Sequence, residues 1–271
     1  MTNVLLIGAG NMGFAMLRTW VGISGFGLSV VEMHEAFRER AQAIGADAYA
    51  DLSDLPAGYR ADVIVLATKP QTIAEVAVRS ADHLREGGLV ISVAAGITID
   101  TIGRSIGRDA AIIRAMPNTP AAIAEGMIVC CASLHATQAD RNRATTLLSV
   151  VGRVAFVEDE DLMDAVTAIS GSGPAYVFYF LETFSAAARS LGLSDDLAMT
   201  LAKQTVFGAA KMALDPDADP ADLRVQVTSP NGTTAAALSV LMDVRHGLAP
   251  LLQNATEAAR RRSRELGLPS S

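Results

Sequence analysis

The first half of the chain alternates short, continuous apolar runs with stretches of helical periodicity. Strands that are buried on both faces have such continuous runs, because both sets of side chains meet helices. Strands that alternate with helices are typical of a parallel sheet covered on both sides. We therefore predict strands at residues 4–7, 28–31, 63–66, 89–93, 111–114 and 127–129.

After about residue 158 the strand pattern stops and apolar positions recur with helical spacing. The predicted helices are 162–169, 175–191, 195–214, 221–227, 233–245 and 248–266. Capping residues at their ends support this interpretation. They are Gly192 and Gly247 after two helices, Ser194 before one, and Asp219 with Pro220 at the start of another. A small helical half has little core of its own, so we expect it to pack against a second copy as a dimer.

Composition narrows the class of protein. The 271-residue chain is 50% hydrophobic and 19% charged, with a formal net charge of -7. These values are typical of one or two globular domains and exclude collagen-like, disulfide-rich and disordered chains. The excess of acid disfavours nucleic-acid binding, which needs a basic surface. No apolar stretch reaches the about 18 residues of a membrane span, and no basic segment precedes the first strand. We therefore expect neither a membrane helix nor a secretory signal.

The two cysteines, Cys130 and Cys131, are adjacent within a predicted strand. Neighbouring side chains of a strand point to opposite faces, so we expect no disulfide between them. Free thiols favour a reducing compartment, and we predict a cytoplasmic location.

A glycine-rich motif, Gly8-x-Gly10-x-x-Gly13, follows the first predicted strand and opens a helix. In that context it is typical of dinucleotide binding. Gly8 permits the tight turn, Gly10 lets a pyrophosphate approach the backbone, and Gly13 lets the helix pack on the strand. Asn11 and Met12 belong to the same predicted site, at the helix start that faces the phosphates. We therefore predict an α/β protein, with a Rossmann-type parallel-sheet domain at residues 1–158 and an all-helical domain at 159–271.

The second predicted strand ends at Glu32, where a carboxylate can accept hydrogen bonds from the adenosine ribose. This favours NAD over NADP, because a 2′-phosphate would meet like charge at Glu32 and Glu35. Arg38 and Arg40 follow on the next helix and offer positive charge to such a phosphate. The choice between the two cofactors stays open at this point.

Loops at the carboxyl ends of later strands should also line the dinucleotide, because open parallel sheets bind their ligands at that edge. The predicted residues are Thr68, Lys69 and Pro70 after the third strand, Ala94, Ala95 and Gly96 after the fourth, and Met116, Pro117 and Asn118 after the fifth. Lys69 also fits a solvated surface lysine. The prolines around the last loop make it stiff, which suits hydride transfer between carbons held near contact.

Two further loops, at residues 170–174 and 227–234, open predicted helices and combine serine, threonine, glycine and proline. Hydroxyls and free amides at a helix N-terminus suit a substrate carboxylate, although ordinary capping turns have the same composition. The four histidines lie outside these loops, and none has the neighbours of a catalytic triad or a metal site. We expect no metal. A cyclic iminium accepts hydride without a strong protein acid, whereas an alcohol dehydrogenase needs one.

The chain resembles the pyrroline-5-carboxylate reductase family along nearly its whole length. The segments that carry the resemblance are 7–13, 67–71, 114–121, 170–175, 208–212 and 227–234. The last of them, Val227-Thr228-Ser229-Pro230-Asn231-Gly232-Thr233-Thr234, is specific to the family. The resemblance implies reduction of 1-pyrroline-5-carboxylate to L-proline by NADPH or NADH, the last step of proline biosynthesis. It also implies a helical dimerisation domain, with the active site between the two domains.

The resemblance further assigns the substrate carboxylate to Ser229, Gly232, Thr233 and Thr234, with Asn231 and Ser172 in the same predicted substrate site. Thr234 matches the hydroxyl that faces the ring nitrogen, and we predict Thr234 and Ser229 as the catalytic residues. Asn231 stands where the family usually has glycine, and asparagine is the residue that best replaces glycine at a positive φ. Asp217 stands where relatives often carry an acid, and a loop-capping role fits it equally. Relatives often assemble dimers into decamers.

Two other functions fit parts of the pattern. A β-hydroxyacid dehydrogenase also begins with this glycine motif and ends in helices, but the helix predicted at 175–191 lacks the lysine of that family. A non-catalytic NAD(P)-binding regulatory protein would not need both polar loops.

Overall fold

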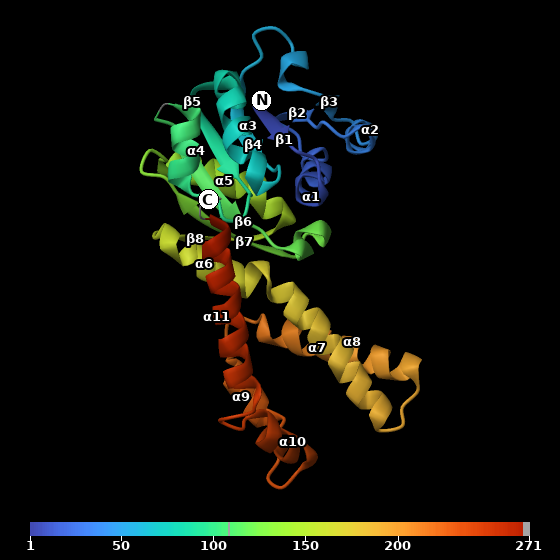
Figure 1. Ribbon diagram of the computed structural model, residues 1–271. Coiled ribbons are helices and arrows are strands. Elements are labelled where there is room, and N and C mark those ends of the chain that lie inside the picture. Colours follow the sequence, from blue (N-terminus) through green and yellow to red (C-terminus); the bar gives the residue numbers. More distant parts are fainter. Residues whose placement is uncertain (108, 268–271) are drawn as a thin grey trace. The chain divides into compact units, whose positions relative to one another are not determined.

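The chain forms two compact units in the computed structural model, which describes residues 1–107 and 109–267 (Figure 1). The first unit comprises Met1–Ser172 and the described chain from Ala259 on, and the second is Gly173–Ala258. Residues between 158 and 172 belong to the first unit because Met163, which is fully buried, packs against Val129 and Cys131 of the sheet.

The first unit contains an eight-stranded sheet in the order β3-β2-β1-β4-β5-β6-β7-β8. Its strands are β1 (Thr2–Ile7), β2 (Phe26–Val31), β3 (Asp47–Tyr49), β4 (Ala61–Leu66), β5 (Leu84–Ser92), β6 (Ala111–Met116), β7 (Gly126–Ala132) and β8 (Gly152–Val157). The first six strands are parallel, as predicted. The predicted strands are all present, and β3 and β8 are additional.

The sheet is not parallel throughout, which corrects the expectation for its last part. Strand β7 pairs antiparallel with β6, and β8 pairs parallel with β7. The cause lies in the connections. Only a short segment with a 3₁₀ turn, Thr119–Ile123, joins β6 to β7, and a short connection permits only antiparallel pairing. Helix α5 (Gln138–Leu148) joins β7 to β8 and provides the crossover that parallel pairing needs.

Alternate residues of the strands enter cores on opposite faces of the sheet, as the continuous apolar runs predict. Val4 and Leu6 of β1 join one cluster, whereas Leu5 and Ile7 join another. The helices that cover the sheet are α1 (Asn11–Trp20), α2 (Glu35–Ala43), α3 (Ile73–Ser80), α4 (Ile99–Ile106) and α5.

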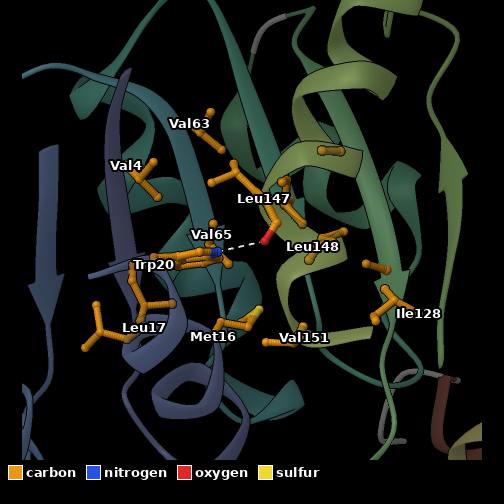
Figure 2. Packing of buried hydrophobic residues seen from close by; sticks show 14 of the residues in the cluster. Val4, Met16, Leu17, Trp20, Val63, Val65, Ile128, Leu147, Leu148 and Val151 are labelled. Atoms are coloured by element: carbon orange, nitrogen blue, oxygen red, sulfur yellow. Dashed lines mark hydrogen bonds between the residues drawn. The ribbon is translucent and has the colours of Figure 1, made fainter. Parts of the chain in front are cut away.

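Trp20 joins α1 to α5 in the first of these clusters (Figure 2). Its indole is fully buried and donates a hydrogen bond of 2.7 Å from Nε1 to the carbonyl oxygen of Leu147. The polar end of a buried tryptophan needs such a partner.

The two cysteines of β7 lie on opposite faces of the sheet, as predicted. Cys130 joins the cluster around Trp20, and Cys131 joins the cluster around Met163; both thiols are free and buried. Burial raises the pKa of the Cys130 thiol to about 12.

The second unit is helical, as predicted. Its elements are α7 (Gly173–Ser190), α8 (Asp195–Ala213), α9 (Pro220–Gln226), α10 (Thr233–Leu241) and the first part of α11 (Leu248–Gly267). Preceding them, in the first unit, are α6 (Met163–Val166) and a π-helical turn, Thr167–Gly171. Among the described residues, no helix has the length and apolar character that a membrane crossing requires.

Most predicted caps of these helices are found. Gly192 follows α7 with a positive φ of 92°, and Asp219 accepts hydrogen bonds from two backbone N–H groups at the start of α9. Ser194 occupies the cap position of α8 without a side-chain hydrogen bond. The prediction for Gly247 is wrong, because α10 already ends at Leu241. The Asp243 carboxylate accepts hydrogen bonds from the backbone of Arg245 and His246 and holds a turn there instead.

Candidate cofactor and substrate sites

The glycine-rich turn after β1 has the geometry that close backbone packing requires. Gly8 has a φ of +96°, and a Cβ on it would lie 2.8 Å from the carbonyl of Ala67. A Cβ on Gly13 would collide with the carbonyl oxygen of Gly8. Around Gly10, in contrast, a Cβ would meet nothing within 4 Å. Gly8 and Gly13 are thus needed by the fold itself, and Gly10 leaves an open side at the start of α1. This arrangement fits a dinucleotide pyrophosphate.

Ala9, between the first two glycines, is held from both sides. Its N–H donates to Glu32 Oε2 at 2.7 Å, and its carbonyl oxygen accepts from Arg40 Nη2 at 2.8 Å. The other oxygen of Glu32 accepts from the N–H of His34 at 2.8 Å, and Glu32 is only 6% exposed. The guanidinium of Arg40 lies 3.8 Å from the centre of the Phe14 ring. The carboxylate at the end of β2 is therefore fixed in place.

The predicted cofactor residues after β4 and β5 form two short loops. Lys69 is exposed and precedes a 3₁₀ turn that begins at Pro70, and Thr72 Oγ1 donates to Thr68 Oγ1 at 3.1 Å. After β5, Ala94 and Gly96 are buried, and Gly96 has a φ of +76°. Both loops follow parallel strands, so they share the sheet edge of the glycine-rich turn.

The loop after β6 contacts the π-helical turn. Asn118 Nδ2 donates to the carbonyl oxygen of Ser170 at 3.2 Å, and Asn118 Oδ1 accepts from the N–H of Met127 at 2.9 Å. Gly171 lies so close to Met116 that a Cβ on it would be 2.7 Å from the Met116 methyl group. The structure thus brings predicted cofactor residues Met116 and Asn118 beside the segment that leads to Ser172. π-Helical turns occur often at functional sites.

Sequence reasoning missed a buried ion pair at this end of the sheet. Arg114 of β6 is buried and donates from Nη1 to Glu160 Oε1 at 2.8 Å. The same oxygen accepts from the N–H of Ile99 at 2.9 Å. An arginine inside an otherwise apolar run was the available signal, because a buried cation needs an anion. Nothing in the sequence pattern around Glu160, which lies 46 residues further along the chain, identifies it as the partner.

The family-specific segment at residues 227–234 (the signature loop) lies in the second unit, between α9 and the start of α10. Asn231 has a φ of 61°, which confirms the positive φ expected at this position. The N–H of Gly232 donates to the carbonyl oxygen of Ser229 at 3.0 Å, and a Cβ on Gly232 would collide with Ser229 Oγ. No side chain caps α10, so the first N–H groups of this helix, including those of Thr233 and Thr234, have no side-chain capping partner.

The predicted site residues therefore fall into two groups. Those expected to bind the cofactor, together with Ser172, belong to the first unit, whereas Ser229–Thr234 belong to the second. Asp217 is exposed in the loop after α8, where its N–H donates to Asp215 Oδ1. Within residues 1–107 and 109–267, His, Cys, Asp and Glu side chains form no group of three or more that could hold a metal ion.

Comparisons with known proteins give matches to both parts of the chain. Residues 160–266 match the family model "Pyrroline-5-carboxylate reductase dimerisation", and residues 3–96 match "NADP oxidoreductase coenzyme F420-dependent". A pyrroline-5-carboxylate reductase of Pseudomonas aeruginosa is 38% identical over 97% of this chain and 96% of its own length.

Solved structures give the same result. A pyrroline-5-carboxylate reductase from Coxiella burnetii superposes with a TM-score of 0.91 at 35% identity, covering 99% of both chains. A Plasmodium falciparum pyrroline carboxylate reductase with NADP bound superposes with a TM-score of 0.83 at 27% identity, covering 98% of both chains. The glycine-rich turn, the signature loop and a match along nearly the entire length lead to one conclusion: the chain belongs to the pyrroline-5-carboxylate reductase family.

Proposed function

We propose that this protein reduces 1-pyrroline-5-carboxylate to L-proline with a nicotinamide dinucleotide, as the last step of proline biosynthesis in the cytoplasm. The observation that carries the proposal is the match to a named reductase over 97% of the chain, which includes the signature loop. The geometry supports it, because a helix start without a side-chain cap and a glycine-rich turn are the features that the two ligands need.

The first unit would hold the dinucleotide, which supplies the hydride when bound. The pyrophosphate would meet the backbone of the turn and helix start. The residues proposed for it are Gly8, Gly10, Asn11, Met12 and Gly13. Glu32 would accept hydrogen bonds from the ribose, and the loops after β4, β5 and β6 would line the rest. Those residues are Thr68, Lys69, Pro70, Ala94, Ala95, Gly96, Met116, Pro117 and Asn118.

The signature loop would hold the substrate. Its carboxylate would accept hydrogen bonds from the first N–H groups of α10 and from the hydroxyls of Ser229 and Thr233, with no arginine required. Gly232 and Asn231 shape this loop, and Ser172 is a further residue proposed to bind the substrate. Thr234 would direct its hydroxyl at the ring nitrogen. Hydride adds to the carbon of the protonated C=N bond, the π electrons move to nitrogen, and a neutral secondary amine results.

We further propose that NADH is the preferred cofactor. Glu32 is buried, and two backbone N–H groups fix its carboxylate. A carboxylate held in this way cannot turn away from a ribose 2′-phosphate, whereas it can accept from a free 2′-hydroxyl. The two arginines of α2 already donate to backbone oxygens, Arg38 to those of Glu32 and Met33 and Arg40 to that of Ala9.

The test is oxidation of NADH and of NADPH, run in parallel with DL-1-pyrroline-5-carboxylate as acceptor and with a chelator in one arm. We expect turnover with both, a higher kcat/KM with NADH, and no effect of the chelator, because no metal is proposed. Turnover with neither cofactor would overturn the proposed reaction. A higher kcat/KM with NADPH would overturn the cofactor preference alone.

A further inference from the structure

The loop from β5 to α4 is packed against the end of helix α11. Gly96 has a φ of +76°, and a Cβ on it would lie 3.5 Å from the backbone of Leu266 and Gly267. In the reverse direction, a Cβ on Gly267 would lie 2.9 Å from the carbonyl oxygen of Gly96. The two backbones are therefore in contact, and a side chain on Gly267 would push this loop. Ala94, Ala95 and Gly96 of the same loop are proposed to line the dinucleotide.

The far end of the same loop is held by Glu160. Its Oε1 accepts from the N–H of Ile99, the first residue of α4, at 2.9 Å. The same oxygen accepts from Arg114 Nη1 at 2.8 Å, and Arg114 is buried. Hydrogen bonds to a charged acceptor with little solvent nearby are stronger than neutral ones. One carboxylate thus links the β5–α4 loop to the strand that leads into Met116 and Asn118.

Asp164, one turn after Glu160, holds the end of α11 itself. Ser263 is 6% exposed and donates from Oγ to Asp164 Oδ1 at 2.7 Å. Arg264 Nε lies 3.6 Å from the other carboxylate oxygen of Asp164. The segment from Glu160 to Asp164 therefore fixes the loop at one end and also fixes the helix that packs on its middle.

We propose that residues 160–164 and the last turns of α11 form a brace that positions the β5–α4 loop for the dinucleotide. Glu160 and Ser263 are its positioning residues, and neither is expected to touch the substrate. The inference rests on the proposed function, which assigns this loop to the cofactor. It adds that the end of α11, which is distant in sequence from the glycine-rich turn, sets the affinity for the cofactor.

The test uses Ser263→Ala and Glu160→Gln, with Arg262→Ala as the matched control. Arg262 lies on the same turn of α11, is exposed, and pairs with Glu265 at 2.8 Å. Glu160→Gln keeps an acceptor for Ile99 and removes the charge that faces Arg114. The readouts are the dissociation constant of NADH by fluorescence, the KM of each substrate, and thermal unfolding.

We expect NADH to bind about threefold more weakly to Ser263→Ala, which loses one hydrogen bond to the Asp164 carboxylate, and about tenfold more weakly to Glu160→Gln, which loses the charge that faces buried Arg114. The KM for 1-pyrroline-5-carboxylate and the kcat at saturating NADH should stay near the wild-type values. Arg262→Ala should bind NADH normally. Glu160→Gln removes the charge that faces buried Arg114, so this variant can fail to fold. If it does, Ser263→Ala alone tests the proposed brace.

Unchanged NADH affinity in folded Ser263→Ala would overturn the brace. So would equal losses of NADH and substrate affinity that follow the thermal stability, because those indicate a purely structural role. The proposed function fails separately: a wild type that binds NADH but does not reduce 1-pyrroline-5-carboxylate would overturn the reaction, while selectively weakened NADH binding in the two variants would still support the brace.

Discussion

At the scale of single residues, Glu32 has a structural role and a proposed role in cofactor binding. Its carboxylate fixes the N–H groups of Ala9 and His34, so it shapes the glycine-rich turn. In the proposed complex the same carboxylate also faces the ribose. A change at this position must therefore be judged on stability and on cofactor choice separately.

Replacing Glu32 with serine should shift the cofactor preference. The ratio of kcat/KM for NADPH to that for NADH should rise about tenfold, equivalent to about 1.4 kcal/mol, because the fixed negative charge near the 2′-position is gone. The free energy of unfolding should fall by about 1–3 kcal/mol, since two backbone N–H groups lose a charged acceptor. Parallel kinetics with both cofactors and denaturant unfolding measure the two effects. Glu39→Ser, at an exposed position of α2, is the control, and an unchanged ratio in Glu32→Ser would refute ribose contact.

Replacing Thr234 should impair substrate binding and turnover but should not change cofactor binding. Thr234→Ala removes the hydroxyl proposed to face the ring nitrogen, so kcat should fall about 100-fold, in the range seen when one donor to the reacting atoms is lost. The KM for 1-pyrroline-5-carboxylate should rise, and the dissociation constant of NADH should stay unchanged. Steady-state kinetics and NADH fluorescence test this, with Ser239→Ala on the exposed side of the same helix as control. An equal loss of NADH affinity would contradict the role of Thr234.

Residue roles could be predicted where the cause is local and not where it is tertiary. The roles of Gly8, Gly13 and Asn231 depend on neighbours within a few residues. The structure confirms the positive φ of Gly8 and Asn231 and the close packing at Gly13. Glu160 acts through Ile99 and Arg114, which are distant in sequence. No spacing rule connects them before the fold is known.

At the scale of elements, the interior strands could be predicted and the edge strands could not. A strand covered on both faces has a continuous apolar run, and β1, β4 and β5 all have one. β3 and β8 stand at the two edges of the sheet. β3 is three residues long, and burial in β8 alternates between intermediate and exposed positions over its first half. Edge strands are commonly short and half solvated, so their apolar signal is weak.

The signature loop offers a prediction at the same scale, because one backbone angle sets its shape. Asn231 has a φ of 61°, which glycine adopts freely and a β-branched residue adopts at a cost of about 1–2 kcal/mol. Asn231→Gly should keep the KM for 1-pyrroline-5-carboxylate near the wild-type value. Asn231→Val should raise that KM about tenfold and leave NADH binding unchanged.

Kinetics of the two Asn231 variants, with thermal unfolding to verify folding, distinguish loop shape from side-chain chemistry. If glycine impairs the enzyme as much as valine does, the asparagine amide itself takes part in binding and the conformational explanation is wrong.

At the scale of the whole molecule, the second unit exposes more apolar surface than a solvated helical domain normally does. Large side chains of α7 and α8 are open to solvent in the single chain, among them Phe178 at 62% and Phe207 at 60% exposure. Buried positions on the same two helices are small: Ser185, Ala198 and Ala202. Apolar patches of this kind mark protein interfaces. Together with the match to a dimerisation family, this supports a dimer formed through the second unit.

A dimer formed through the second unit leads to a prediction about mass. The wild type should have at least twice the 28.3 kDa mass of one chain, and Phe178→Asp with Phe207→Asp should reduce it to the mass of a single chain. Each phenylalanine fully covered on association contributes about 1.5–3 kcal/mol, and a carboxylate in its place must be buried without a partner. Light scattering after size-exclusion chromatography measures the mass. Val78→Asp is the matched control, because Val78 on α3 is 58% exposed in the first unit and its replacement should leave the mass unchanged. A monomeric wild type, or a double variant that keeps the wild-type mass, would show that these helices do not form the dimer interface.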